Sequence, residues 1–65
     1  MKIQIKDTVT WKCAVGELTG TVVNIVLDLN AARKIVPWID VKTDRTTIRL
    51  CATDMNLKMM SVVKI

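Results

Sequence analysis

Apolar and polar residues alternate near the start of the chain in the pattern that strands require. Val9, Trp11 and Cys13 are separated by polar residues, so one face of this segment is apolar and the other polar. Period-two alternation is typical of a strand with one buried face. We therefore predict a first strand over residues 8–13, with Trp11 in the core. Gly16 follows it and permits the backbone angles of a tight turn.

A second strand is predicted from Leu18 to Leu29, and both of its faces are apolar. Strict alternation directs its aliphatic side chains to two sides, with Val22 and Val26 on one and Val23, Ile25 and Leu27 on the other. Two explanations are open. A bulge after Gly20 switches the faces, as is common in strongly bent barrel strands, or a partner covers the outer face.

Three further strands are predicted, over residues 35–43, 46–52 and 60–65, and the last is expected to pair with the first. Asn30 to Lys34 has weak strand propensity and is predicted as a hairpin loop. Pro37 has no amide hydrogen, so its end of the third strand should lie at a sheet edge or a bulge. Thr53 to Asn56 is predicted as a cap and one turn of 3₁₀ helix before the last strand. The side chains expected to face inward on the third and fourth strands are Ile35, Ile39, Val41, Ile48, Leu50 and Ala52.

The order of these elements, over a single domain of residues 1–65, resembles the SH3-like barrel superfamily. The closest pattern is that of KOW modules, carried here by Asp7, Val9, Trp11, Gly16, Gly20, Val22 and Ile25. Members commonly have glycine before the aspartate, where this chain has Lys6. The resemblance implies an all-β fold, a single five-stranded antiparallel barrel. KOW-like modules occur in ribosomal and transcription proteins, where they bind RNA or protein, and Tudor-like modules are related. Such a fold does not by itself specify a function.

Composition predicts an apolar surface. Hydrophobic residues make up 51% of the 65 positions, although Phe and Tyr are absent. A chain this short buries only about 60% of the surface of its unfolded state. Some aliphatic side chains should therefore stay outside and mark an interface. We predict a homo-oligomer or a bound protein partner, with an interface formed by Val23, Ile25, Leu27, Val36 and Met59.

Charge supports a competing expectation. Ten Lys and Arg against six Asp and Glu give a net charge of +4, which either keeps a small domain soluble or attracts phosphate. Lys12, Lys42 and Arg49 share the outward parity of their strands, and Arg45 lies in the adjoining turn. These residues form the predicted RNA- or DNA-binding face. The alternative is a solvated face that Asp40 partly neutralises.

Trp38 is the other candidate binding residue. Its parity is opposite to that of Ile39 and Val41, so it should point outward. An outward tryptophan serves as an anchor for a protein partner or as a platform for a stacked base. The alternative is a ring that lies flat on the neighbouring strand or covers one end of the barrel.

The sequence offers little for catalysis or metal binding. His is absent, and Cys13 and Cys51 are far apart, whereas a zinc site needs four ligands at close spacing. Carboxylates in paired spacing and a glycine-rich phosphate loop are also missing. We predict no enzyme, no cofactor and no metal, with an active site built between oligomer copies as the alternative. The cysteines are predicted to be two buried thiols, and a single disulfide is the alternative.

Location and partner follow from these observations. Met1 to Ile5 alternates like a strand, not like a signal peptide, and the apolar run from Val22 to Leu29 is too short to span a bilayer. We predict a cytoplasmic protein without membrane contact. The function predicted from sequence is a small, basic, non-catalytic binding module with RNA or DNA as the preferred partner. The alternative is a protein-interaction or self-assembly module that uses an exposed aliphatic face.

Overall fold

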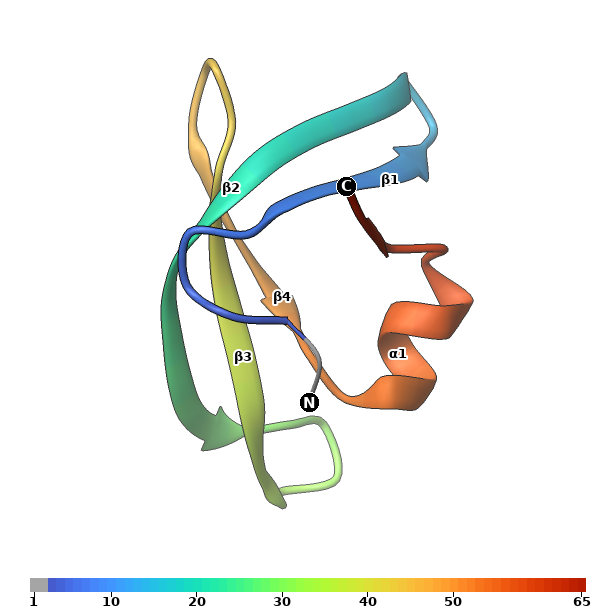
Figure 1. The fold of residues 1–65 in the computed structure, drawn as a ribbon. Helices are drawn as coiled ribbons and strands as arrows, with labels where there is room; N and C mark the ends of the chain where they lie inside the picture. The colour runs from blue at the N-terminus through green and yellow to red at the C-terminus, as the bar shows by residue number, and fades with distance from the viewer. Residues whose placement is uncertain (1–2) are drawn as a thin grey trace.

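The computed structural model describes residues 3–65, which form five β-strands and one short helix (Figure 1). The elements are β1 Thr8–Cys13, β2 Gly16–Leu29, β3 Ile35–Lys42, β4 Thr47–Cys51, α1 Asp54–Met59 and β5 Val63–Lys64. The strands make one antiparallel sheet in the order β4-β3-β2-β1-β5. The all-β class is confirmed. Within the described residues β4 and β5 lie at the two ends of this order, so the sheet is not closed and the predicted barrel is not confirmed.

The long strand β2 belongs to both halves of the sheet. Its residues 16–21 pair with β1, and its residues 21–29 pair with β3. The register shifts between Val22 and Asn24, which leaves Val23 as the extra residue of a bulge. After the bulge Ile25 pairs with Ile39 and packs against the core. The bulge is therefore the correct explanation for the two apolar faces at this point, and the expected grouping of Ile25 with Val23 on one outer face is wrong.

The core lies between the concave side of the sheet, the N-terminal segment and α1. Its buried members are Ile3, Val9, Trp11, Val22, Ile39, Val41, Leu50, Ala52 and Leu57. The inward positions predicted on β3 and β4 are confirmed with one exception, because Ile35 is 65% exposed. β4 pairs with β3 only from Trp38 to Lys42, so Ile35 lies beyond the part of the sheet that the core covers.

The N-terminal segment differs from its predicted strand. Residues 3–7 form no strand, while Met1 and Lys2 lie outside the described residues. The chain turns at Lys6, whose φ is 77°. The Lys6 N–H donates to the carbonyl oxygen of Val22 at 2.8 Å. This turn directs Ile3 into the core, which is why alternation alone gave the wrong element.

The segment after β4 is an α-helix and not the single 3₁₀ turn predicted. The Thr53 side chain accepts a hydrogen bond from the Asn56 N–H, and Asp54 lies in the first turn. Leu57 is buried in the core, so tertiary packing stabilises a helix that is too short to be stable alone. The last strand covers only Val63–Lys64, shorter than predicted, and it pairs with β1 as expected.

The two cysteines are free thiols. Cys13 is exposed, because it ends β1 next to the two-residue turn to Gly16, beyond the core. Cys51 is half-buried on β4. The prediction of a buried thiol is therefore wrong for Cys13. Among the described residues, no helix is long and apolar enough to cross a membrane.

Candidate interaction surfaces

The end of the β2–β3 hairpin presents exposed aliphatic side chains on one face. Leu27 pairs with Pro37 and Leu29 pairs with Ile35, so all four residues lie on the side of the sheet that carries Ile39. Leu27 is 72% exposed, Ile35 65% and Leu29 52%. We call Leu27, Leu29, Ile35 and Pro37 the hairpin surface.

The hairpin surface is exposed because the β2–β3 hairpin extends beyond the ends of the neighbouring strands β1 and β4. β1 pairs with β2 only as far as Thr21, and β4 pairs with β3 only as far as Trp38. In residues 3–65, the last part of the hairpin therefore has no strand on either side, and it extends past the body of the molecule in Figure 1. The side chains of the hairpin surface are on the same face of the sheet as the core residues, but they lie beyond the core and do not contact it.

Hydrogen-bonded and non-hydrogen-bonded residue pairs alternate between β2 and β3. This alternation shows which backbone groups of β2 point away from β3, toward the edge of the hairpin that has no neighbouring strand. The Asn30 N–H donates to the Lys34 carbonyl at the base of the turn, at 2.9 Å. Because hydrogen-bonded pairs alternate in an antiparallel ladder, even-numbered residues of β2 bond to β3 here. The amides of residues 25, 27 and 29 consequently point away from β3.

Two side chains cover part of that edge. The Ile25 N–H donates to Asn24 Oδ1 at 3.0 Å, and the Leu29 N–H donates to Asp28 Oδ1 at 2.7 Å. Occupied edge amides are a means by which proteins prevent strand addition. The accessible feature of the hairpin is therefore its apolar side-chain face.

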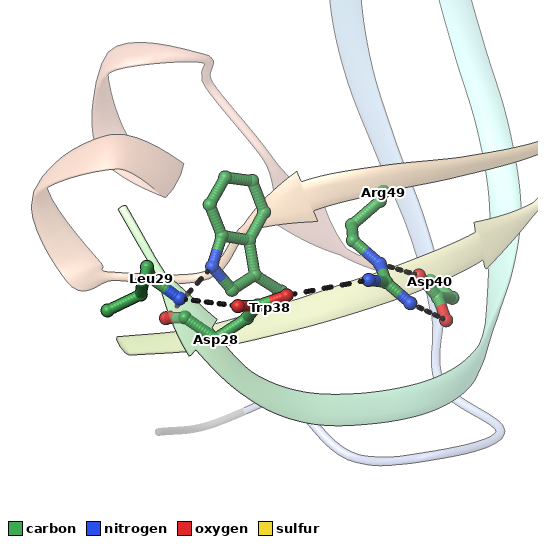
Figure 2. Close-up of polar contacts among 5 residues, drawn as sticks. All are labelled: Asp28, Leu29, Trp38, Asp40 and Arg49. Carbon is green, nitrogen blue, oxygen red and sulfur yellow. Dashed lines mark hydrogen bonds and ion pairs between the residues drawn. The ribbon is translucent and has the colours of Figure 1, made fainter. Parts of the chain in front are cut away.

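The opposite face of the sheet carries a charged cluster, shown in Figure 2. The Arg49 Nε donates to Asp40 Oδ1 at 2.8 Å, and a second Arg49 nitrogen donates to Asp40 Oδ2 at 3.3 Å. Arg49 also lies 4.0 Å from Asp28 Oδ2. The hydrogen bond from Arg49 is the main cause that holds the pKa of Asp40 below its usual range, and the same bond raises the pKa of Arg49. The Arg49 guanidinium is thus already occupied by carboxylates.

Trp38 lies on this outer face, as predicted, and is half-buried. Its Nε1 donates to the carbonyl oxygen of Asp28 at 3.3 Å, which fixes the indole beside the end of β2 (Figure 2). The ring helps to line a groove of about 380 Å³ between the β2–β3 turn and α1. Residues 30–32, Trp38, Cys51, Met55 and Met59 line what we call the helix groove.

The remaining residues predicted to bind nucleic acid do not form one continuous patch. Lys42 and Arg49 share a face as predicted, but Arg49 lies directly across from Asp40 and forms an ion pair with it, whereas Lys42 lies across from Thr47. Arg45 lies in the β3–β4 turn. Lys12 is on β1, directly across from Glu17 on β2.

The residues predicted to form an oligomer interface fall in different places. Leu27 is on the hairpin surface, and Met59, 77% exposed, lines the helix groove. Val36 is half-buried on the face opposite to Leu27, Val23 is the partly exposed bulge residue, and Ile25 packs against the core.

On the hairpin surface and in the helix groove, sequence reasoning missed three exposed residues: Leu29, Ile35 and Met55. For Ile35 the available signal was Pro37, because a proline that cannot donate to a ladder suggests that the neighbouring strand has ended. Ala52, just after β4, does bond to the Pro37 carbonyl, and Ile35 lies beyond that last contact.

Residues 3–65 contain no group of three or more His, Cys, Asp or Glu side chains arranged to hold a metal ion. Comparisons of the chain with protein-family models, curated proteins and solved structures found no match.

Proposed function

We propose that this protein is a small, non-catalytic protein-interaction module that self-associates through its hairpin surface. The observation that supports the proposal is the exposure of Leu27, Leu29 and Ile35 side by side on one face. Contiguous exposed apolar side chains on a small domain mark an interaction site more often than scattered ones do.

The free energy that burial of the hairpin surface can provide limits which partners can bind it. Full burial of a Leu or Ile side chain stabilises by about 1.5–3 kcal/mol, so three side chains that are each more than half exposed offer roughly 3–6 kcal/mol. Association costs an estimated 4–15 kcal/mol in lost translational and rotational freedom, which the contacts must offset. The hairpin surface therefore needs an apolar counterpart, and a second copy of the chain provides one.

Nucleic-acid binding is the second candidate function. It is supported by the net charge of +4 and by Lys12, Lys42 and Arg45, which form no ion pair within the described residues. The occupied guanidinium of Arg49 and the fixed indole of Trp38 weaken it, because both were expected to contact the ligand. Fluorescence anisotropy with single-stranded RNA and DNA at low salt tests it. Phosphate binding shows a log–log salt slope of about −0.7 to −0.9 per contact.

Two further proposals accompany the function. The two free thiols support a reducing, cytoplasmic location. The resemblance to SH3-like and KOW modules is supported by Lys6, whose φ of 77° falls in the region that favours glycine. It occupies the position where members commonly have glycine.

The test of self-association compares matched variants by sedimentation velocity. Leu27→Thr and Ile35→Thr keep β-propensity but remove exposed apolar area, so the fold should survive while association weakens. Val15→Thr is the control, because Val15 is 86% exposed in the other hairpin turn. We expect oligomers of the wild type and of Val15→Thr, and monomers of the doubly substituted Leu27→Thr/Ile35→Thr chain. A monomeric wild type would refute the proposal.

A further inference from the structure

Three sulfur-containing side chains line the helix groove. They belong to Cys51 at the end of β4 and to Met55 and Met59 of α1. Each follows the one before it by four positions in the sequence. Side chains four residues apart on a helix are neighbours on one face, with Cβ atoms about 5–6 Å apart. The two thioethers of α1 therefore lie next to each other on the side of the helix that faces the groove.

The fold holds the Cys51 thiol at the start of α1. Its Sγ lies 4.0 Å from Oγ1 of Thr53, the residue that caps the helix. The Cys51 carbonyl oxygen accepts a hydrogen bond from the Asn56 side-chain amide at 2.7 Å, which ties the end of β4 to the helix. The thiol is thus fixed beside α1, whereas the unbranched, flexible methionine side chains can adjust their sulfur atoms around it.

The sulfur atoms of the groove are accessible, unlike that of the neighbouring Met60. Met55 is 75% exposed and Met59 is 77% exposed, and Cys51 is a half-buried free thiol. Met60, in contrast, packs against the core, and its Sδ accepts a hydrogen bond from the Asn56 side chain at 3.5 Å. Core packing therefore explains Met60 but not the two exposed methionines.

We propose that the helix groove binds the soft monovalent ion Cu(I) through the sulfur atoms of Cys51, Met55 and Met59. Thiolate and thioether ligands select Cu(I), whereas carboxylate and carbonyl oxygens suit harder ions. Within the described part of the chain, no His, Asp or Glu side chain lines this groove. Structural zinc sites take four ligands, but Cu(I) is satisfied by fewer sulfur atoms. The sulfur set of the groove thus fits Cu(I) better than zinc.

The charge of the ion also suits an apolar groove. Cu(I) replaces the thiol proton of Cys51, so one proton is released to solvent and the copper–thiolate unit is neutral. A neutral unit avoids the large cost of placing an unpaired charge in apolar surroundings. Reducing conditions that keep both cysteines as free thiols also keep copper as Cu(I).

The experiment titrates the reduced full-length chain with Cu(I) under anaerobic conditions, in competition with the chromogenic chelator bathocuproine disulfonate. We expect one Cu(I) per chain. Trp38 pairs with Cys51 in the β3–β4 register and lines the same groove, so its fluorescence should be quenched as the ion binds. Trp11 is 3% exposed in the core and should keep its emission, which makes the quenching partial.

Variants identify the ligands. Cys51→Ser removes the thiolate, and Met55→Leu/Met59→Leu removes both thioethers while keeping apolar volume and helix propensity. Outer partners of metal ligands are worth about 10–100-fold in affinity, so loss of a ligand should weaken Cu(I) binding at least about tenfold. Cys13→Ser is the matched control, because Cys13 is an exposed thiol outside the groove. It should bind Cu(I) like the wild type. Circular dichroism and thermal unfolding establish that each variant is folded.

Two results would overturn the inference. Equal affinity in the wild type and in Met55→Leu/Met59→Leu would show that the thioethers are not ligands. Binding that Cys13→Ser abolishes, or one Cu(I) shared by two chains through that residue, would assign the ion to the exposed thiol. The inference does not depend on self-association, because Leu27→Thr/Ile35→Thr leaves the groove intact and should bind Cu(I) like the wild type.

Discussion

Gly20 lies so close to Val41 that a Cβ atom at position 20 would come within 2.5 Å of Val41 Cγ1. The Lys42 carbonyl oxygen, at 2.9 Å, restricts the same space from the backbone. We expect Gly20→Ala to lower the free energy of unfolding by about 1–3 kcal/mol, because the added methyl group overpacks the site where β2 changes partners. Urea denaturation measures this change.

A double-mutant cycle separates the two obstacles. Val41→Ala removes the nearer one and leaves the Lys42 carbonyl in place, so Gly20→Ala should cost less in the Val41→Ala background than in the wild type. Equal costs in the two backgrounds would show that the Val41 side chain is not what excludes a larger residue.

The turn at Lys6 offers a stabilising substitution. A left-handed backbone conformation costs a non-glycine residue roughly 1–2 kcal/mol, and Lys6 has a φ of 77°. Glycine removes that cost but adds entropy to the unfolded chain. We expect Lys6→Gly to raise the free energy of unfolding by about 0.5–1 kcal/mol. Lys6→Ala, which keeps the Cβ atom, is the control, and a similar gain there would point to loss of the lysine charge.

The sequence predicts most of the strands because only one face of each strand packs against the core, which produces a period-two alternation of apolar residues. Val9, Trp11 and Val41 alternate with polar residues, and each is buried as that pattern indicates. Alternation fails where the chain stops being a regular strand. Val23 interrupts the period as a bulge, so the parity assigned to Ile25 was reversed. The two apolar faces of this strand suggested a bulge after Gly20, but the sequence alone did not place it at Val23.

The candidate surface was harder to predict than the fold. Exposure of Ile35 depends on where β4 ends, a tertiary fact that the pattern of β3 does not contain. The pairing of Arg49 with Asp40 depends on the register between two strands. Parity places Asp40 on the same face as Lys42 and Arg49, where it can neutralise a cation, but parity alone does not say which of the two it contacts.

The Asp40–Arg49 ion pair predicts a dependence of stability on pH. The pKa of Asp40 is lowered in the folded state, chiefly by the hydrogen bond from Arg49. A lowered folded pKa means that the stabilisation is present above the unfolded pKa, about 3.9, and is lost as the pH falls through the folded value. Asp40→Asn should therefore lower the Tm at neutral pH and have a much smaller effect near about pH 2.

Asp44→Asn is the matched control for that comparison, because Asp44 is an exposed carboxylate in the β3–β4 turn without an ion pair in residues 3–65. We expect it to change the Tm little at either pH. If Asp40→Asn lowers the Tm equally at both pH values, the loss comes from packing and not from the charge of Asp40.

The cap of α1 predicts a further effect on stability. Thr53 Oγ1 accepts a hydrogen bond from the Asn56 N–H at 3.3 Å. Thr53→Ala should lower the free energy of unfolding by about 1 kcal/mol, whereas Thr53→Ser keeps the hydroxyl group and should lose less. Urea denaturation of both variants tests this, and equal losses would mean that the Thr53 methyl group, and not the cap, is responsible.

The salt dependence of self-association tests the central claim most directly. Sedimentation equilibrium of the wild-type chain, from about 0.05 to 0.5 M NaCl, separates an apolar contact from one made by charge. We predict association that persists or strengthens as salt rises, because salt screens the repulsion between copies that each carry a net charge of +4. A monomer of 7.3 kDa at every concentration, or oligomers that dissociate as salt rises, would contradict the account.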